Sequence, residues 1–255
     1  SQADQEELLK KYSKEDQGKL FVTKPLYQRA LIVAGGPLAN FILALFIFTF
    51  IYMFAGKDFT PAVIDEVLKE SPAEVAGMQK NDVIIEIDNA KVESILDVSK
   101  LIAMSTSEFI DFKVSRYDQE IILKVKPNFV DSIDELGNKL KKRMVGIKLS
   151  PYNNQITHKK LGPAQAIMQS FNEVYFVTTS SLKYLGAMFT GAGDSSQLGG
   201  PIRIAKISGQ VAEFGIVPFI SMMAYISISL GLINLFPIPL LDGGHLMFYA
   251  FEKVL

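Results

Sequence analysis

Two long stretches without a charged residue constrain the fold of this chain more than any other feature. One comprises 27 residues, 30–56, and the other 28 residues, 214–241. A helix that crosses a bilayer needs about 20 apolar residues. Both stretches therefore predict transmembrane helices. The first is too long for a signal peptide and follows a charged lead of nearly thirty residues.

The composition excludes several functions. The 255 residues carry a net charge of -1, so no nucleic-acid partner is expected. Cysteine is absent, which excludes disulfides, cysteine-ligated zinc and a thiol nucleophile. A metal would need Asp, Glu or one of the two histidines, His158 and His245. His158 lies in the polar segment THKK and is expected at the surface.

The charge distribution predicts a topology. Residues 1–29 are rich in Lys and Glu, with basic residues close to the first apolar stretch. The positive-inside rule places this segment in the cytoplasm. With two spans, both ends would be cytoplasmic and residues 57–213 would contain an extracytoplasmic domain.

Residues 57–150 alternate apolar and polar positions between turn signals, which indicates a β-rich module. Predicted strands cover 63–67, 83–87, 109–116, 120–127 and 144–150, and predicted helices cover 92–104 and a short segment opened by Ser71 and Pro72. Residues 151–213 are expected to form a linker and an interfacial amphipathic helix, with Gly199, Gly200 and Pro201 breaking any helix before the second span.

The stretch NLFPIPLLDGG places a carboxylate, Asp242, behind a proline-broken apolar helix. Pro237 prevents a regular helix, and Gly243 allows a tight turn or a close approach. An ionisable residue at this depth indicates function. Asp242 is either a metal ligand or a cap for the helix that follows.

A second polar group lies in the first span, in AGGPLANF. Asn40 is a buried amide that needs a partner. It either binds an unwound substrate strand or joins two helices.

The string SPAEVAGM…NDVIIEIDNAKV resembles PDZ domains of bacterial envelope proteases. The resemblance implies peptide binding at a sheet edge, which we assign to Met144, Val145, Gly146 and Ile147. The alternative is a steric plug that binds no peptide.

Four motifs together, YQRALIVAGGPLANF, the PDZ-like string, GGPIRIAK and GLINLFPIPLLDGGHLMFYAFE, resemble bacterial site-2 proteases of the RseP type, in peptidase family M50. The resemblance implies a multi-pass α-helical membrane protein with an inserted α+β PDZ-like domain. It implies Zn²⁺, with Asp242 as third ligand and an active site lined by Asn40, Asn234, Pro237 and Gly243.

The sequence departs from the family pattern in two ways. It lacks the HExxH motif that supplies the other two zinc ligands and the general base, so this chain alone is expected to be an inactive fragment. It has one PDZ-like module where well-known members have two. His245, three residues after Asp242, could share a metal but is expected to be a structural or supporting residue.

The resemblance implies cleavage of transmembrane substrates, such as anti-sigma factors or remnant signal peptides, in the bacterial inner membrane, with the PDZ-like domain on the periplasmic side and a possible peptide carboxyl terminus bound there. A non-catalytic PDZ-bearing membrane scaffold is the alternative. A transporter ranks third, because the two spans show no repeat symmetry.

Overall fold

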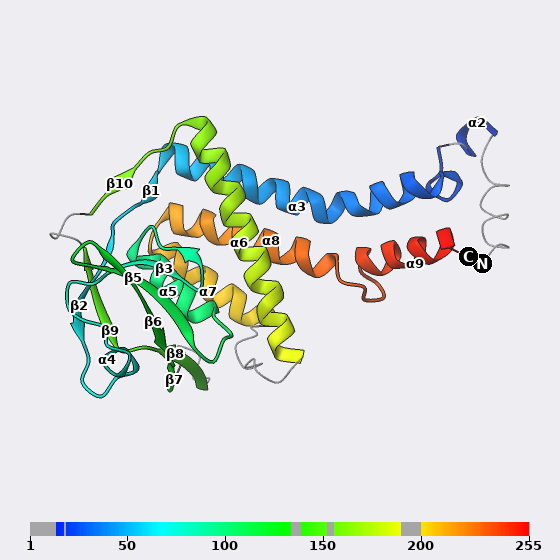
Figure 1. Ribbon diagram of the computed structural model, residues 1–255. Helices are drawn as coiled ribbons and strands as arrows, with labels where there is room; N and C mark the ends of the chain where they lie inside the picture. The colour runs from blue at the N-terminus through cyan, green and yellow to red at the C-terminus, as the bar shows by residue number, and fades with distance from the viewer. Residues whose placement is uncertain (1–13, 18, 134–138, 152–155, 190–199, 255) are drawn as a thin grey trace. The chain divides into compact units, whose positions relative to one another are not determined.

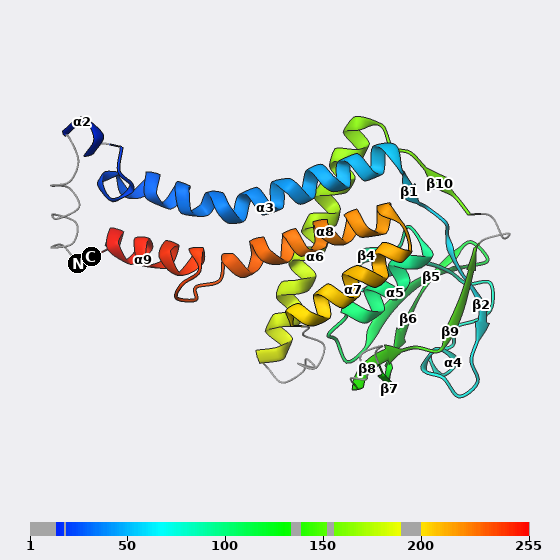
Figure 2. The same ribbon diagram turned by 180° about the vertical axis from the view of Figure 1, so that it is seen from behind.

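The computed structural model describes residues 14–17, 19–133, 139–151, 156–189 and 200–254 (Figures 1 and 2). The chain divides into two compact units. The first unit comprises residues 1–47 and 223–255, and the second comprises residues 48–222. Each is described by itself.

The first unit is helical. It contains α2 (Lys14–Gln17), the short η1 (Phe21–Thr23), most of α3 (Leu26–Phe54), the second half of α8 (Ile216–Asn234) and α9 (Asp242–Val254). Among the described residues, α3 and α8 are long and apolar enough to cross a membrane. The predicted span 214–241 is wrong at its end, because α8 stops at Asn234 and the segment with Pro237 and Pro239 is not helical.

The second unit is built around a β-rich region that we call the sheet module, residues 62–151. Its main sheet has the order β6-β5-β3-β2-β9, with β4 paired to β3, and all its pairs are antiparallel. The strands are β2 (Ala62–Val67), β3 (Val83–Ile87), β4 (Ala90–Lys91), β5 (Ile110–Arg116), β6 (Gln119–Val125) and β9 (Ile147–Pro151). Two two-stranded sheets pair β7 (Asn128–Ile133) with β8 (Lys139–Met144) and β1 (Lys57–Asp58) with β10 (His158–Lys159).

Local signals explain the short elements of the sheet module. Ser71 caps α4 (Pro72–Val75) by accepting a hydrogen bond from the Glu74 N–H. Tyr117 and Asp118 both have positive φ, as a two-residue hairpin turn requires, and join β5 to β6. The helix predicted over 92–104 begins three residues later, as α5 (Ile95–Met104), because Ser94 and Asp97 form a capping box there.

The strand predicted over 144–150 is wrong in its first part. Met144 ends β8 and Ile147 begins β9, so two strands of different sheets replace one. Gly146 has a φ of +82°, a conformation that turns the chain between them. The carbonyls of Val145 and Gly146 accept hydrogen bonds from Ala73 and Leu68, and Val145 is buried in the core.

Two further helices belong to the second unit. The segment predicted to form an interfacial helix is helical, as part of α6 (Pro163–Phe189), which begins earlier than its apolar pattern indicates. The sequence did not predict α7 (Pro201–Glu213). Pro201, which was predicted to break a helix, is the first residue of α7, a position that favours proline; Gly199 lies outside the described residues.

The core of the sheet module contains a buried ion pair. Asp82 is fully buried and accepts two hydrogen bonds from Arg116, at 2.7 and 2.8 Å, and one from the Gln79 N–H. The hydrogen bonds that Arg116 donates to Asp82 raise the pKa of its guanidinium. A buried charge needs such a set of partners. This pair therefore fixes the end of β5 against the turn before β3.

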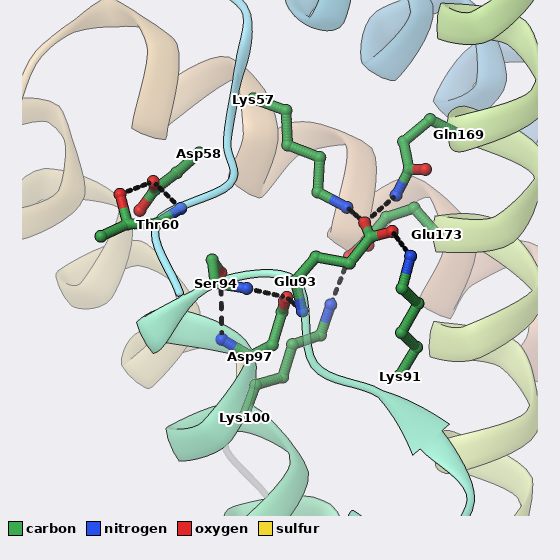
Figure 3. A network of polar contacts seen from close by, with 10 residues as sticks. All are labelled: Lys57, Asp58, Thr60, Lys91, Glu93, Ser94, Asp97, Lys100, Gln169 and Glu173. Carbon is green, nitrogen blue, oxygen red and sulfur yellow. Dashed lines mark hydrogen bonds and ion pairs between the residues drawn. The ribbon is translucent and has the colours of Figure 1, made fainter. Parts of the chain in front are cut away.

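A polar network joins three parts of the second unit, as Figure 3 shows. Glu93, before α5, accepts hydrogen bonds from Lys57 of β1, from Lys91 at 3.3 Å and from Gln169 of α6 at 3.4 Å. Lys100 of α5 also pairs with Glu173 of α6. These bonds fasten α6 to the sheet module.

Acid should weaken this network. Burial of Glu93 opposes its ionisation, but Lys57 and then Lys91 outweigh burial and lower the pKa of Glu93. A lowered pKa contributes stability at pH values above the ordinary pKa of about 4.3. This contribution is lost as the pH falls from there through the lowered pKa of Glu93. We expect Glu93→Gln to lower the unfolding free energy by about 1 kcal/mol at pH 7 and to have a smaller effect at pH 3. Thermal unfolding of the detergent-solubilised chain between pH 3 and 7 measures this difference, and an equal effect at both pH values would contradict it.

Candidate functional site

The loop between α8 and α9 places Asp242 as the first residue of α9. Pro239 and Leu240 occupy the middle of a turn closed by a hydrogen bond from the Leu241 N–H to the Ile238 carbonyl at 3.1 Å. Leu240 has a φ of +80°, which is strained for a residue with a side chain, and it is 97% exposed. Backbone strain of this kind persists only where the surroundings enforce it.

Two buried glycines start α9 beneath this loop. A Cβ built on Gly243 would lie 2.3 Å from the carbonyl oxygens of Leu235 and Phe236. A Cβ built on Gly244 would lie 2.4 Å from the Ile238 carbonyl oxygen. No other residue type fits these positions without moving backbone atoms. The glycines therefore allow α9 to begin directly against the end of α8.

The carboxylate of Asp242 is half-buried and faces α3. A Cβ built on Gly36 of α3 would lie 3.1 Å from its Oδ2 atom. Within the described part of the chain, the Asp242 carboxylate has no hydrogen bond or ion pair. The capping alternative requires a bond from a backbone N–H at the start of α9, and the described residues form none. The oxygens of Asp242 thus remain available to a ligand.

Asn40 lies one helical turn beyond Gly36, on the same face of α3. Ser227 of α8 donates a hydrogen bond to the Asn40 carbonyl at 2.9 Å. A Cβ built on Gly231, one turn further along α8, would lie 3.2 Å from the Asn40 Cβ and 3.1 Å from the Pro37 carbonyl oxygen. Small residues one turn apart allow two apolar helices to approach closely. This contact brings α8 against the segment GGPLAN.

The other predicted lining residues lie on the connecting segment. Asn234 is the last residue of α8 and is half-buried, whereas Pro237 is exposed. His245 shares α9 with Asp242 but is exposed. The structure therefore places Asp242 beside the face of α3 that carries Gly36 and Asn40. Asn234 ends α8, Pro237 lies in the connection between α8 and α9, and Gly243 follows Asp242 in α9.

The described residues supply one candidate metal ligand at this site, Asp242. Across residues 14–254, with the gaps given above, no group of three or more His, Asp or Glu side chains could hold a metal ion. A hard carboxylate with free oxygens is a suitable zinc ligand. The described residues at this site therefore fit zinc in part, since they offer one of the three protein ligands that a catalytic zinc site uses.

A groove of about 580 Å³ lies in the second unit. One wall is α5, with Val98 and Ile102, and the other is the end of β8 and the start of β9. The predicted peptide-binding residues Met144, Val145, Gly146 and Ile147 all line it, and β9 is the edge strand of the main sheet. A peptide added to β9 would therefore lie in this groove.

Arg143 also lines the groove, next in sequence to Lys141 and Lys142. Its guanidinium is 5.3 Å from the centre of the Phe129 ring, and its Nη1 atom is buried without a hydrogen-bond partner among the described residues. Burial lowers the pKa of Arg143. A buried N–H without an acceptor is costly. This position is suited to a bound anion or carbonyl oxygen.

A carboxylate that lies beside an apolar helix long enough to cross a membrane, and that has no partner among the described residues, is typical of membrane proteins that act on a substrate or an ion within the bilayer. The chain belongs to peptidase family M50, whose profile matches residues 3–255.

Curated relatives agree with this assignment. A protein of Agrobacterium fabrum, provisionally named a zinc metalloprotease, is 36% identical over 242 residues, covering 95% of this chain and 64% of its own length. A similarly named protein of Rhizobium meliloti is 36% identical over 240 residues, covering 94% and 64%. The metalloprotease MmpA of Caulobacter vibrioides is 32% identical over 251 residues, covering 92% and 62%. The chain thus spans less than two thirds of the length of these relatives.

Sequence reasoning missed several residues of the site. Ser227 and Gly231 carry a readable signal, since small residues four apart in an apolar helix indicate close packing. The contact of Gly36 with Asp242 and the buried guanidinium of Arg143 depend on tertiary structure, and no spacing in the sequence indicates them.

Proposed function

We propose that the protein acts as an intramembrane zinc metalloprotease, in which Asp242 supplies one zinc ligand. The observation that carries the proposal is the half-buried Asp242 carboxylate beside Gly36 of α3, a helix long enough to cross a membrane, with no partner among the described residues. Membership of peptidase family M50 supports the proteolytic chemistry. Zinc would supply a bound water whose pKa is lowered to about 7.

The residues of this chain would hold the metal and the substrate. Asp242 would coordinate zinc, and Pro237 would keep the approach to it free of regular helix. Asn40 and Asn234 would bind the backbone of a substrate helix that has unwound locally, because a helical amide is shielded by its own hydrogen bonds. The substrates would be membrane-anchored proteins, such as anti-sigma factors or remnant signal peptides.

The other ligands would come from an HExxH motif, which does not occur in these 255 residues. We propose that the active enzyme also contains the helix with this motif. The test is cleavage of a model transmembrane substrate in liposomes by the full-length protein and by this chain alone. We expect cleavage by the full-length protein that stops on zinc chelation and resumes when zinc is restored, and none by this chain. Cleavage that is unaffected by chelation would contradict the proposal.

The sheet module would be a PDZ-like domain on the extracytoplasmic side of the bacterial inner membrane. Its groove would receive the carboxyl terminus of a substrate trimmed by an earlier protease. The position of the groove beside an edge strand and an amphipathic helix supports peptide addition to β9. Arg143 would bind the terminal carboxylate, since its buried Nη1 atom needs an acceptor.

Arg143→Ala should therefore weaken binding of a peptide with a free carboxyl terminus by about 10- to 100-fold, the effect of one charge-assisted hydrogen bond. Fluorescence anisotropy of labelled peptides measures the affinity. A carboxyl-terminal amide is the matched control, and we expect it to bind both proteins equally weakly. If the unmutated protein bound peptides with a free and with an amidated carboxyl terminus equally well, the groove would not recognise the terminal carboxylate.

The module could instead exclude substrates whose outer domain is still large. Deleting residues 60–150 separates the two roles. Loss of cleavage of a trimmed substrate indicates recruitment, whereas new cleavage of an intact substrate indicates exclusion.

A non-catalytic membrane scaffold is the second candidate function. The observation that favours it is the absence of HExxH from these residues. A full reading frame without that motif would establish the scaffold.

A further inference from the structure

The α9 helix is held against α3 at two points. At its start, Asp242 lies beside Gly36. Near its end, Glu252 accepts a hydrogen bond from Nη2 of Arg29 at 2.7 Å, and the Arg29 guanidinium lies 5.2 Å from the centre of the Tyr249 ring. Figures 1 and 2 both show α9 beside the first half of α3. Residue numbers rise along α9 as they fall along α3, so the two helices are antiparallel.

Helical periodicity places these groups on one face of each helix. Arg29 and Gly36 are seven residues, or two turns, apart on α3. Asp242 and Tyr249 have the same spacing on α9, and Glu252 lies almost one turn further on. The contact of Arg29 with α9 and the contact of Asp242 with α3 therefore belong to a single helix interface.

The helix dipoles of α3 and α9 do not favour the charges of Arg29 and Glu252. Arg29 lies near the amino end of α3, and Glu252 lies in the last turn of α9. A cation at an amino end and an anion at a carboxyl end are both disfavoured by the helix dipole. The Arg29 side chain is only 18% exposed, so its charge needs a partner. The arrangement is favourable only when the two helices meet.

We propose that Arg29 is a positioning residue for Asp242. By binding Glu252 and stacking on Tyr249, it fixes the position of α9 along α3 and so keeps the Asp242 carboxylate beside Gly36. Loss of either contact lets α9 shift or tilt, which moves the carboxylate away from the metal. The inference rests on the proposed role of Asp242 as a zinc ligand.

The test measures zinc affinity by competition with a chelator, together with kcat and KM on a transmembrane substrate, in the full-length protein. We expect Arg29→Ala to lower zinc affinity about 10- to 100-fold, as loss of a group that orients a ligand does. We also expect kcat to fall and KM to stay unchanged, because Arg29 does not touch the substrate. Tyr249→Leu removes only the ring contact and should have a smaller effect in the same direction.

A charge exchange provides the control for folding. Arg29→Glu combined with Glu252→Arg keeps the pair and gives each helix end the charge that its dipole prefers. We expect this double variant to recover zinc affinity to within about threefold of the unmutated protein. Lys19→Ala is the matched control, since Lys19 pairs with Asp16 in an exposed position, and it should bind zinc normally.

Unchanged zinc affinity in both Arg29→Ala and Tyr249→Leu would overturn the inference, and so would a double variant that binds zinc no better than Arg29→Ala. Asp242→Ala separates this failure from failure of the proposed function. If Asp242→Ala loses zinc while the Arg29 and Tyr249 variants keep it, only the positioning role fails. If Asp242→Ala also keeps zinc, the proposed ligand itself is wrong.

Discussion

We expect Asp242→Ala to remove zinc from the full-length protein and to lower cleavage by at least about a thousandfold, equivalent to roughly 4 kcal/mol of transition-state stabilisation. The physical reason is the small number of ligands. A catalytic zinc site uses three protein ligands. The described residues of this chain offer only the Asp242 carboxylate beside Gly36. Zinc content by elemental analysis and cleavage of a transmembrane substrate measure the two effects.

The matched control is Asp65→Ala, which removes an exposed carboxylate of β2 that pairs only with Lys80 in the described part of the chain. It should change neither zinc content nor cleavage. If Asp242→Ala cleaved at the unmutated rate, the carboxylate would have to be assigned a structural role. Asp242→Asn refines the result, because it keeps the shape but weakens the ligand.

Gly243→Ala should disable the same site without touching a ligand. The added methyl group would lie 2.3 Å from the carbonyl oxygens of Leu235 and Phe236. These are backbone atoms at the end of α8, so the clash can be relieved only by moving the loop or the start of α9. Either movement displaces Asp242, the adjacent residue. We expect zinc affinity to fall about 10- to 100-fold and cleavage to fall with it.

Gly209→Ala controls for the same chemical change. Gly209 lies inside α7, and a Cβ built there meets nothing within 4 Å among the described residues. Alanine also favours helix more than glycine does, so the control should be neutral or slightly stabilising. Unchanged zinc affinity in Gly243→Ala would show that the loop between α8 and α9 can shift without moving the carboxylate.

The sequence predicted those elements whose signals are local. Apolar length identified α3 and α8, and the turn residues of the sheet module identified β2, β3 and the β5–β6 hairpin. Capping by Ser71 followed from its own neighbours. These predictions succeeded because helix length, strand alternation and capping depend on residues close together in the chain.

The failures involve longer-range effects. The segment 144–150 looked like one strand, but Val145 and Gly146 turn between partners that lie far apart in sequence. For the site, the sequence singled out Asp242 by its unusual place after an apolar helix. It could not show that the carboxylate faces Gly36, or that Arg29 reaches Glu252 at a sequence separation of 223 residues. Such contacts are fixed by helix packing and have no local pattern.

The most direct test of the central claim is zinc X-ray absorption spectroscopy on the full-length Asp242→Cys variant, with any other cysteines replaced. The 255 residues contain no cysteine, so a sulfur bound to zinc would report position 242 alone. If Asp242 is a zinc ligand, the spectrum of the variant will contain one sulfur at about 2.3 Å, and the unmutated protein will show only nitrogen and oxygen ligands. Zinc that is retained in the variant with nitrogen and oxygen ligands alone would contradict the account.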